Sequence, residues 1–250
     1  MSADFAARWT RALALLAWLG ALGAPVAARA EEEVPVETVV LLHGLLRTDR
    51  SMRKLATHLE EAGYTVQNIR YPSRDLAPDA LVEDLHTQLE RCCADAARIH
   101  FVTHSLGGIL LRAYLAKHEL PRIGRVVMLA PPNHGSEYVD ALRDFRLFRW
   151  VFGPTGAELG TDLQSLPNRL PPVGFELGVI AGTRGINPLS YFVMPAASDG
   201  TVSLESARLD GMQDFVAIPA SHSFIMYSDL AVDLTLEFLR SGRFARAESR

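Results

Sequence analysis

The sequence predicts an α/β domain in which helices cover both faces of a mostly parallel central sheet. Two observations lead to this fold class. Short runs of Val, Leu and Ile alternate along the chain with segments whose apolar residues recur at helical spacing. The runs are apolar throughout, as strands of a parallel sheet are when both of their faces are buried. No internal repeat or low-complexity linker interrupts this alternation, so a single sheet domain is expected.

Each element can be placed from these patterns. Strands are expected at residues 38–42, 64–69, 99–103, 126–130, 175–181, 191–194 and 215–218. Apolar stripes predict helices at residues 52–59, 81–89, 106–117 and 230–238, and Gly63 stands just after the first of them, where helix ends favour glycine. The alternation breaks between residues 137 and 170, where aromatic and arginine side chains mix without a strand pattern. We expect a cap inserted into the domain at about residues 137–172.

The first thirty residues have the layout of a secretory signal peptide. Arg8 and Arg11 form a short basic region, residues 12–28 carry no charge, and small residues end the segment at Ala30. The uncharged run is shorter than the roughly 20 residues of a spanning helix, and glycine and proline interrupt it. We therefore expect cleavage after Ala30, a domain at residues 31–250, and export to the periplasm or the medium. An uncleaved membrane anchor is the alternative.

Charge and cysteine content argue against several classes of function. The 250-residue chain has a net charge of −4, and loss of the signal segment, with three Arg and one Asp, would change it to −6. A mildly acidic chain without a basic run argues against a nucleic-acid partner. Cys92 and Cys93 are adjacent, which disfavours a disulfide between them, and no C-x-x-C metal pattern occurs. We expect both cysteines to be unpaired residues of a helix. We expect no catalytic metal, although a bound structural calcium ion stays an open alternative.

The decisive segment runs from Ile99 to Gly108, where a buried strand passes directly into Ser105 and a helix begins. A turn this sharp strains the backbone of the serine and exposes its hydroxyl at the carboxyl edge of the sheet. The residues two before and two after must be small because strand and helix approach each other there, and Gly107 meets this need. The helix start also offers backbone N–H groups to a developing oxyanion. We predict Ser105 as a nucleophile.

This segment resembles the G-x-S-x-G nucleophile elbow of the α/β-hydrolase family, in particular of bacterial lipase-like serine esterases. Thr103 stands where the family has its first glycine, and its β-branching suits the end of a strand. The resemblance implies an α/β-hydrolase fold with an inserted cap, and carboxylic ester hydrolysis without a metal or organic cofactor. In organisation it extends from Val39 to about Leu239.

A second buried strand ends in His43-Gly44, the junction that forms the other half of the oxyanion hole in this family. Glycine lets the backbone approach a substrate closely. The resemblance implies that the N–H groups of Leu45 and Leu106 bind the oxyanion. His43 itself is expected to bond within the loop and support it, not to transfer protons.

A serine nucleophile needs a base, and the base needs an orienting carboxylate. In this fold they follow in the chain order Ser, then Asp or Glu, then His. Asp199 begins a D-G-x-V turn like the acid turn of the family, and His222 lies between the last strand and the last helix, where the family carries its base. The competing acids, Asp162 and Asp214, do not sit in a turn directly after a clear strand. We predict a triad of Ser105, Asp199 and His222.

Two further histidines are predicted to lie at the substrate pocket. His104 adjoins the nucleophile, but its backbone position directs it away from the hydroxyl. His134 belongs to the loop from Ala130 to Ser136, which resembles the A-P-P-N-x-G-S loop of lipase-like esterases and lies too early in the chain for the base. We expect His134 to line the pocket or to order this loop.

The predicted cap leaves two interpretations open. Phe145, Phe148, Trp150 and Phe152 alternate with arginines, as in an amphipathic lid that touches a lipid surface. An ordinary cap helix that packs its apolar face on the domain is the default interpretation. An ester or lipid substrate is expected in either case.

Two other functions are compatible with the same residues. An acyltransferase would form the same acyl-enzyme and replace water with an alcohol in the second step. A binding protein that kept the fold and lost the chemistry is the other alternative. The intact set of Ser105, Asp199 and His222 argues against it.

Overall fold

The computed structural model describes residues 37–186, 188, 190–195 and 197–244 of the chain. The chain divides into two units, Met1–Val34 and Pro35–Arg250, and the described residues all belong to the second. The predicted signal segment at residues 1–30 and its cleavage point lie outside the described residues. Within the described residues, no helix has the length and apolar character needed to cross a bilayer.

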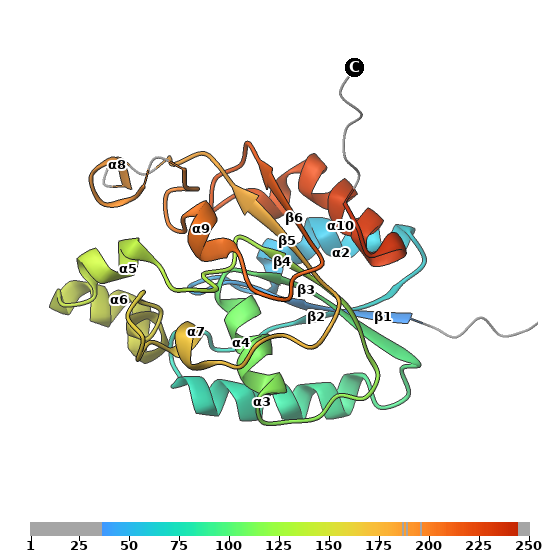
Figure 1. Ribbon diagram of the computed structural model, residues 1–250. Coiled ribbons are helices and arrows are strands. Elements are labelled where there is room, and N and C mark those ends of the chain that lie inside the picture. Colours follow the sequence, from blue (N-terminus) through green and yellow to red (C-terminus); the bar gives the residue numbers. More distant parts are fainter. Residues whose placement is uncertain (1–36, 187, 189, 196, 245–250) are drawn as a thin grey trace, which may run out of the picture. The chain divides into compact units, whose positions relative to one another are not determined.

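A six-stranded parallel sheet forms the centre of the domain, in the order β2-β1-β3-β4-β5-β6 (Figure 1). The strands are β1 (Glu37–Leu42), β2 (Thr65–Ile69), β3 (Arg98–His104), β4 (Ile123–Leu129), β5 (Leu177–Gly182) and β6 (Asp214–Ile218). The central strand β3 pairs with both β1 and β4, so that Val102 lies between Leu41 and Val127. All six strands were predicted from their apolar runs, and the predicted fold class is confirmed.

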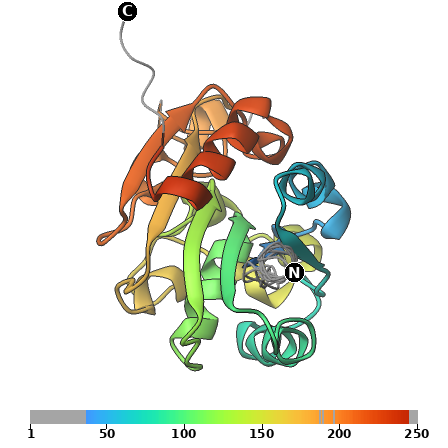
Figure 2. The same cartoon turned by 90° about the vertical axis from the view of Figure 1, so that its right-hand side faces the viewer.

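Helices cover both faces of the sheet (Figure 1), and Figure 2 shows the same layers turned by 90°. Side chains alternate between the two faces along each strand, and each set enters its own apolar core. Val39 and Leu41 pack with α2 (Arg53–Glu61) and α10 (Asp229–Ser241). Val40 and Leu42 pack with α3 (Pro78–Cys92) and α4 (Leu106–Leu115). Because both faces are covered, every central strand is buried, as its composition requires.

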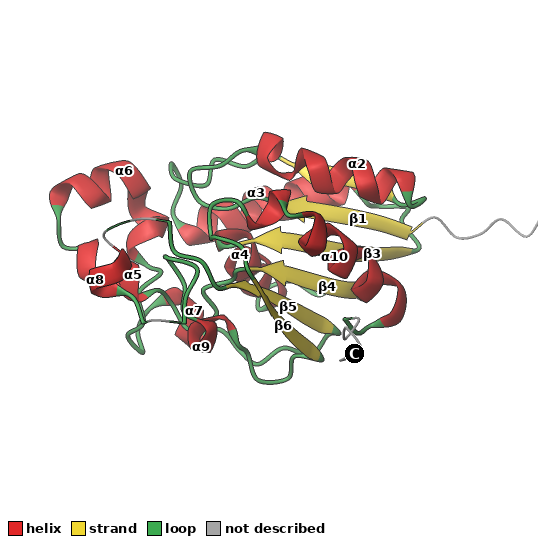
Figure 3. Cartoon of the chain, turned by 90° about the horizontal axis from the view of Figure 1, so that it is seen from above, coloured by secondary structure: helices red, strands yellow, loops and turns green. Residues whose placement is uncertain are grey.

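The remaining elements are short. They are η1 (Asp49–Met52), α5 (Glu137–Leu142), α6 (Arg146–Ala157), α7 (Leu166–Arg169), α8 (Ser190–Val193), α9 (Leu204–Ala207) and η2 (Ile225–Tyr227). The segment predicted as a cap forms α5, α6 and α7. In Figure 3, α5 and α6 lie beyond the carboxyl ends of the strands, the edge at which α/β folds place their sites.

The prediction of a strand at residues 191–194 is wrong. The segment belongs to the helical turn α8, in which the amide of Met194 donates to the carbonyl of Ser190 at 2.9 Å. Tyr191 and Phe192 are 77% and 87% exposed, so no neighbouring strand or core packs on them. A four-residue aromatic and β-branched run cannot be told from a helical turn by its pattern alone.

Both cysteines stand at the end of α3, as predicted, and both are free thiols. Cys93 is buried in the core beside α4, whereas Cys92 is half-buried. Their part in the fold is therefore that of small apolar helix residues.

The junction between β3 and α4 depends on the absence of side chains at two glycines. A Cβ atom on Gly107 would lie 2.5 Å from the carbonyl oxygen of Leu42, closer than any contact a carbon can make there. One on Gly108 would lie 3.2 Å from Oγ1 of Thr103. Gly108 therefore leaves the space that Thr103 occupies, so a threonine side chain fits at this position.

A buried arginine ties this helix to the cap. Arg112 on α4 is 4% exposed and has no carboxylate partner among the described residues. Its guanidinium donates to the carbonyl of Asn133 at 3.0 Å and to that of Pro167 in α7 at 3.2 Å. Burial lowers the pKa of Arg112 to about 10, so it is charged at neutral pH. The helix that follows the serine is thus fixed to the loop after β4 and to α7.

We expect Gly107→Ala to destabilise the protein although alanine is the better helix former. The clash with the Leu42 carbonyl should cost about 1–3 kcal/mol, which outweighs the gain of about 1 kcal/mol from helix propensity. Urea unfolding would measure the change. Gly174→Ala is the matched control, because a Cβ there meets nothing within 4 Å. Equal stability of the two variants would contradict the proposed close approach.

Candidate active site

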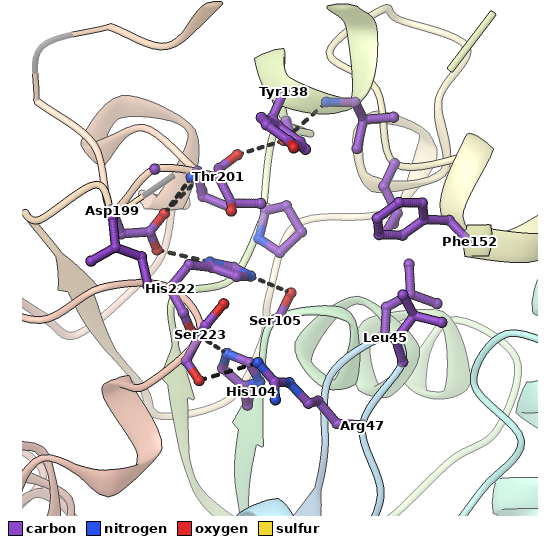
Figure 4. A pocket seen from close by; sticks show the side chains of 18 of the residues that line it. Leu45, Arg47, His104, Ser105, Tyr138, Phe152, Asp199, Thr201, His222 and Ser223 are labelled. Carbon is purple, nitrogen blue, oxygen red and sulfur yellow. Dashed lines mark hydrogen bonds and ion pairs between the residues drawn. The ribbon is translucent and has the colours of Figure 1, made fainter. Parts of the chain in front are cut away.

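Ser105, His222 and Asp199 come together at the carboxyl edge of the sheet from three different loops (Figure 4). Nε2 of His222 lies 3.0 Å from Oγ of Ser105. Nδ1 of His222 lies 2.8 Å from Oδ2 of Asp199. Ser105 has φ 52° and ψ −120°, the strained backbone expected of a serine between a strand and a helix. The arrangement can accept the serine proton on one ring nitrogen and hold the other with a carboxylate.

The carboxylate of Asp199 is fixed by its own turn. Its Oδ1 accepts hydrogen bonds from the amides of Thr201 and Val202 at 2.9 and 2.8 Å. Asp199 is 2% exposed, and its carbonyl accepts the amide of His222 at 3.1 Å. One oxygen is therefore committed to the turn, and the other is left to orient the imidazole.

His104 lines the cavity beside Ser105. Its Nε2 donates to the carbonyl of His222 at 3.0 Å, and its ring lies 5.2 Å from that of His222. Burial, and then the neighbouring charge of His222, lower the pKa of His104 well below its ordinary value of 6.5. A neutral His104 holds the main chain of His222 in place without adding a positive charge beside it.

His43 supports the loop after β1, as expected. It is fully buried, its Nδ1 lies 2.9 Å from the carbonyl of Gly44, and its ring stacks on Tyr71 at 4.1 Å. The hydroxyl of Tyr71 in turn donates to the carbonyl of His43. Burial lowers the pKa of His43. Tyr71 was not predicted as a contact of this loop, because the sequence shows only that it follows β2.

The amides of Leu45 and Leu106 are available for an oxyanion. Within the described residues neither donates to a main-chain carbonyl. Leu106 is the first residue of α4, so the helix dipole adds to its N–H. The loop turns at Leu46, which has φ 58°, and the amide of Arg47 closes it on the carbonyl of Gly44 at 3.2 Å.

A cavity of about 380 Å³ opens at the serine. The cap supplies an apolar wall that includes Val139, Phe148, Phe152 and Leu159. Phe148 and Phe152 of α6 stack on each other at 4.3 Å. Polar residues also line the cavity: Thr201 lies near Tyr138 of α5, whereas Arg47 and Ser223 lie near His104 (Figure 4). The cavity therefore offers both apolar and polar groups close to Ser105.

The other predicted candidates lie elsewhere. His134 is exposed, does not line the cavity, and has Nδ1 3.2 Å from Oδ1 of Asn168, so it orders its loop. Asp162 pairs with Arg143 at 2.5 Å in the cap. Asp214 accepts the amide of Phe244 at 2.9 Å at the far end of β6. None of the three approaches the serine.

The loop around His134 connects the site to the cap. The hydroxyl of Ser136 caps α5 and donates to the carbonyl of Thr201 at 2.5 Å, within the acid turn. Asn133 donates to the carbonyl of Ala207 at 2.9 Å. These bonds connect Asn133 and Ser136 of this loop to the segment that follows Asp199.

Arg47 was not predicted from the sequence to line the cavity. It follows the predicted oxyanion loop directly, but a lone arginine has no periodic or motif signal, and its place in the cavity depends on how the loop turns. Among the described residues, no group of three His, Cys, Asp or Glu side chains could hold a metal ion.

Several known proteins resemble this chain in sequence or fold. The model of the palmitoyl protein thioesterase family matches residues 38–161, which include the elbow and most of the cap. The lipase BlEst2 of Bacillus licheniformis superposes with a TM-score of 0.64 at 19% identity, over 82% of this chain and 92% of the lipase. The chain has the α/β-hydrolase fold.

Two more solved structures share the fold. The phospholipase PlaB of Legionella pneumophila has a TM-score of 0.66 at 18% identity, over 83% of this chain and 61% of PlaB. The metagenomic carboxyl esterase MGS0156 has a TM-score of 0.61 at 20% identity, over 77% and 66%. No curated protein gives a significant sequence match. The family match and these structures agree with the α/β-hydrolase fold that the sequence predicted.

We expect the protein to lose stability when the pH falls below about 6.5, the pKa of an unfolded histidine. Burial lowers the pKa of His43, His100 and His104, so the unfolded chain binds protons in a range where the folded chain stays neutral. More protons on the unfolded chain mean that the free energy of unfolding falls as the pH falls, by up to about 1.4 kcal/mol per pH unit for each histidine.

Urea unfolding between about pH 7.5 and pH 5 would measure this slope. His104→Gln, which keeps a donor for the His222 carbonyl, should make it shallower. An identical slope in the variant would contradict the assignment of His104 as a buried neutral group.

Proposed function

We propose that the protein hydrolyses carboxylic esters through Ser105, His222 and Asp199. One observation carries the proposal: a continuous chain of contacts runs from Oδ2 of Asp199 through both nitrogens of His222 to Oγ of Ser105, at 2.8 and 3.0 Å. Both distances are within hydrogen-bond reach, which a base must meet before its pKa matters.

The reaction proceeds through an acyl-enzyme. His222 takes the proton of Ser105 as Oγ attacks the acyl carbonyl, and Asp199 holds the imidazole tautomer and stabilises the positive ring. The leaving oxygen receives this proton from His222. Water, activated by His222, then attacks the acyl carbon and releases the acid and the free serine. No metal or organic cofactor takes part in these steps.

The amides of Leu45 and Leu106 bind the oxyanion in both steps. Donors fixed by the backbone need no rearrangement as the negative charge develops, which is why such sites stabilise the transition state strongly. Gly44 keeps this loop close to the site, because a Cβ there would lie 2.6 Å from Nδ1 of His104.

The acyl group lies against the apolar wall formed by the cap. Phe148 is 6% exposed and Leu159 is 4% exposed, so they present little surface to solvent outside the cavity. Burying an acyl chain against such side chains contributes about 25 cal/mol per Å² of apolar surface. The size of this wall sets the acyl chain length that the protein accepts.

Thioesters form a second candidate substrate class, which the match to the palmitoyl protein thioesterase family favours. The same serine chemistry applies, with a thiol as the leaving group. Transfer of the acyl group to an alcohol uses the same intermediate, and product analysis with added alcohol would detect it.

The cap also presents apolar side chains outward, and we propose that they contact the surface of a lipid substrate. Phe145, Leu147 and Trp150 are 62%, 70% and 72% exposed, while Phe148 of the same segment points inward. Tyr191 and Phe192 of α8 add to this surface beside α5 (Figure 1). Export, proposed from the signal segment, would place the protein where such substrates occur.

Labelling of the full chain with a fluorophosphonate probe tests the triad. The wild type should be labelled on Ser105, and Ser105→Ala should not. Hydrolysis of a short-chain nitrophenyl ester should fall by about 10⁴-fold or more in Ser105→Ala and in His222→Ala. His58→Ala, on α2, is the control and should hydrolyse the ester at the wild-type rate. Absence of label on folded wild-type protein would overturn the catalytic assignment.

Vesicle sedimentation tests the lipid contact. In a Ser105→Ala background, which leaves the lipid intact, Leu147→Ser should weaken binding to phosphatidylcholine vesicles by about tenfold, the loss expected for one buried leucine. Leu230→Ser on α10 is the matched control, because Leu230 is 46% exposed but lies away from the cap. Equal loss of binding in both variants would argue against a docking surface on the cap.

A further inference from the structure

Arg47 connects the catalytic cavity to a second hollow. It lines the cavity at Ser105, and it also lines an adjoining groove of about 550 Å³ formed by residues 46–48 and 70–75. Figure 4 shows its side chain beside His104 and Ser223. Arg47 therefore borders both hollows and can contact a group bound in either of them.

The groove is positively charged in an acidic protein. Arg47, Arg70 and Arg74 line it, against one carboxylate, Asp75. Nε of Arg74 lies 3.7 Å from Oδ1 of Asp75, and its Nη2 donates to the carbonyl of Trp150. The chain as a whole has a net charge of −4, so this local excess of cations contrasts with the rest of the protein.

The guanidinium of Arg47 keeps most of its donors free. Nη2 donates to the carbonyl of Ser223 at 3.3 Å, and within the described residues Arg47 forms no ion pair. An arginine has five N–H donors in a planar fork that matches a phosphate or carboxylate. Arg70 likewise has no side-chain partner among the described residues and is exposed.

Arg47 is placed to contact the leaving group of a substrate and not its acyl chain. The leaving oxygen or sulfur must take its proton from His222. Arg47 is bonded to Ser223, the next residue, whereas the apolar wall for the acyl chain is provided by α5 and α6. The two halves of a substrate therefore meet different chemistry close to the serine.

We propose that the protein prefers acyl esters or thioesters whose leaving group carries a phosphate, and that Arg47, with Arg70, binds that phosphate. This inference rests on the proposed hydrolase function. Serine attacks the acyl carbon, the C–O or C–S bond breaks, and the phosphorylated alcohol or thiol leaves with the proton of His222. No phosphorus–oxygen bond is broken. Two classes share this chemistry, lysophospholipids and acyl thioesters of phosphorylated thiols.

Paired substrates test the preference. Oleoyl lysophosphatidate and monooleoylglycerol differ by one phosphate, and oleoyl-coenzyme A and the oleoyl thioester of N-acetylcysteamine give the thiol counterpart. With the full chain and substrates in monomeric form, the ratio of kcat/KM for the phosphorylated over the uncharged member should exceed one in at least one pair. That pair identifies the source of the phosphate. The ratio should fall as ionic strength rises.

Substitution of Arg47 should remove this preference. Arg47→Gln is expected to lower the ratio by at least about tenfold, the effect of one charge-assisted hydrogen bond. Arg47→Lys should restore part of it because the charge returns without the fork. Arg70→Gln should lower the ratio as well. Arg53→Gln, which removes an exposed arginine of α2, is the matched control for net charge. A ratio unchanged in Arg47→Gln would overturn the proposal.

A binding measurement separates this proposal from the hydrolase function. Ser105→Ala should bind glycerol 3-phosphate in calorimetry, and the double variant with Arg47→Gln should not. If no ester is hydrolysed but this binding is seen, the hydrolase function fails and the anion site stands. If esters are hydrolysed but glycerol 3-phosphate does not bind and the ratios equal one, the anion site is wrong and the hydrolase function stands.

Discussion

The site depends on one strained residue, Ser105, held between β3 and α4. Its φ of 52° is unfavourable for any side-chain-bearing residue, and the surrounding backbone must enforce it. The amide of Ser105 donates to Leu129 of β4 at 2.9 Å, and its carbonyl accepts the amide of Gly108 at 3.0 Å. Gly107 then brings the helix against the Leu42 carbonyl. Sheet, turn and helix together aim one hydroxyl at one imidazole.

The parallel sheet supplies the rest of the geometry. Loops after β3, β5 and β6 carry Ser105, Asp199 and His222, and the carboxyl ends of parallel strands meet at one edge. Main-chain bonds then fix the base from two sides. The amide of His222 donates to Asp199, and its carbonyl accepts from His104. Because a neutral His104 makes the second bond, the imidazole of His222 is positioned without a competing charge.

The features predicted correctly from the sequence are those that depend on residues close together in the chain. Apolar runs identified β1 to β6, and the elbow and chain order identified the three residues that the structure brings together. The strand predicted at residues 191–194 was wrong because a short apolar run forms a strand only if another strand pairs with it. The two roles expected of His134 could not be separated from the sequence, because its contact with Asn168 depends on how the chain folds. Arg112, in a predicted helix, is buried without a carboxylate partner among the described residues, and no spacing rule marks such a residue.

The bend in α6 has a consequence for how the cap could evolve. Gly153 has φ 69°, and its α-carbon is in such close contact with the carbonyl of Arg74 that no side chain could be accommodated. The cap is therefore seated on the wall of the arginine-lined groove. The two surfaces that we propose bind opposite halves of a substrate meet at this glycine, so the cap cannot be exchanged independently of the groove. A lineage that remodels the cap for a new acyl chain would have to keep this glycine or rebuild the groove at the same time.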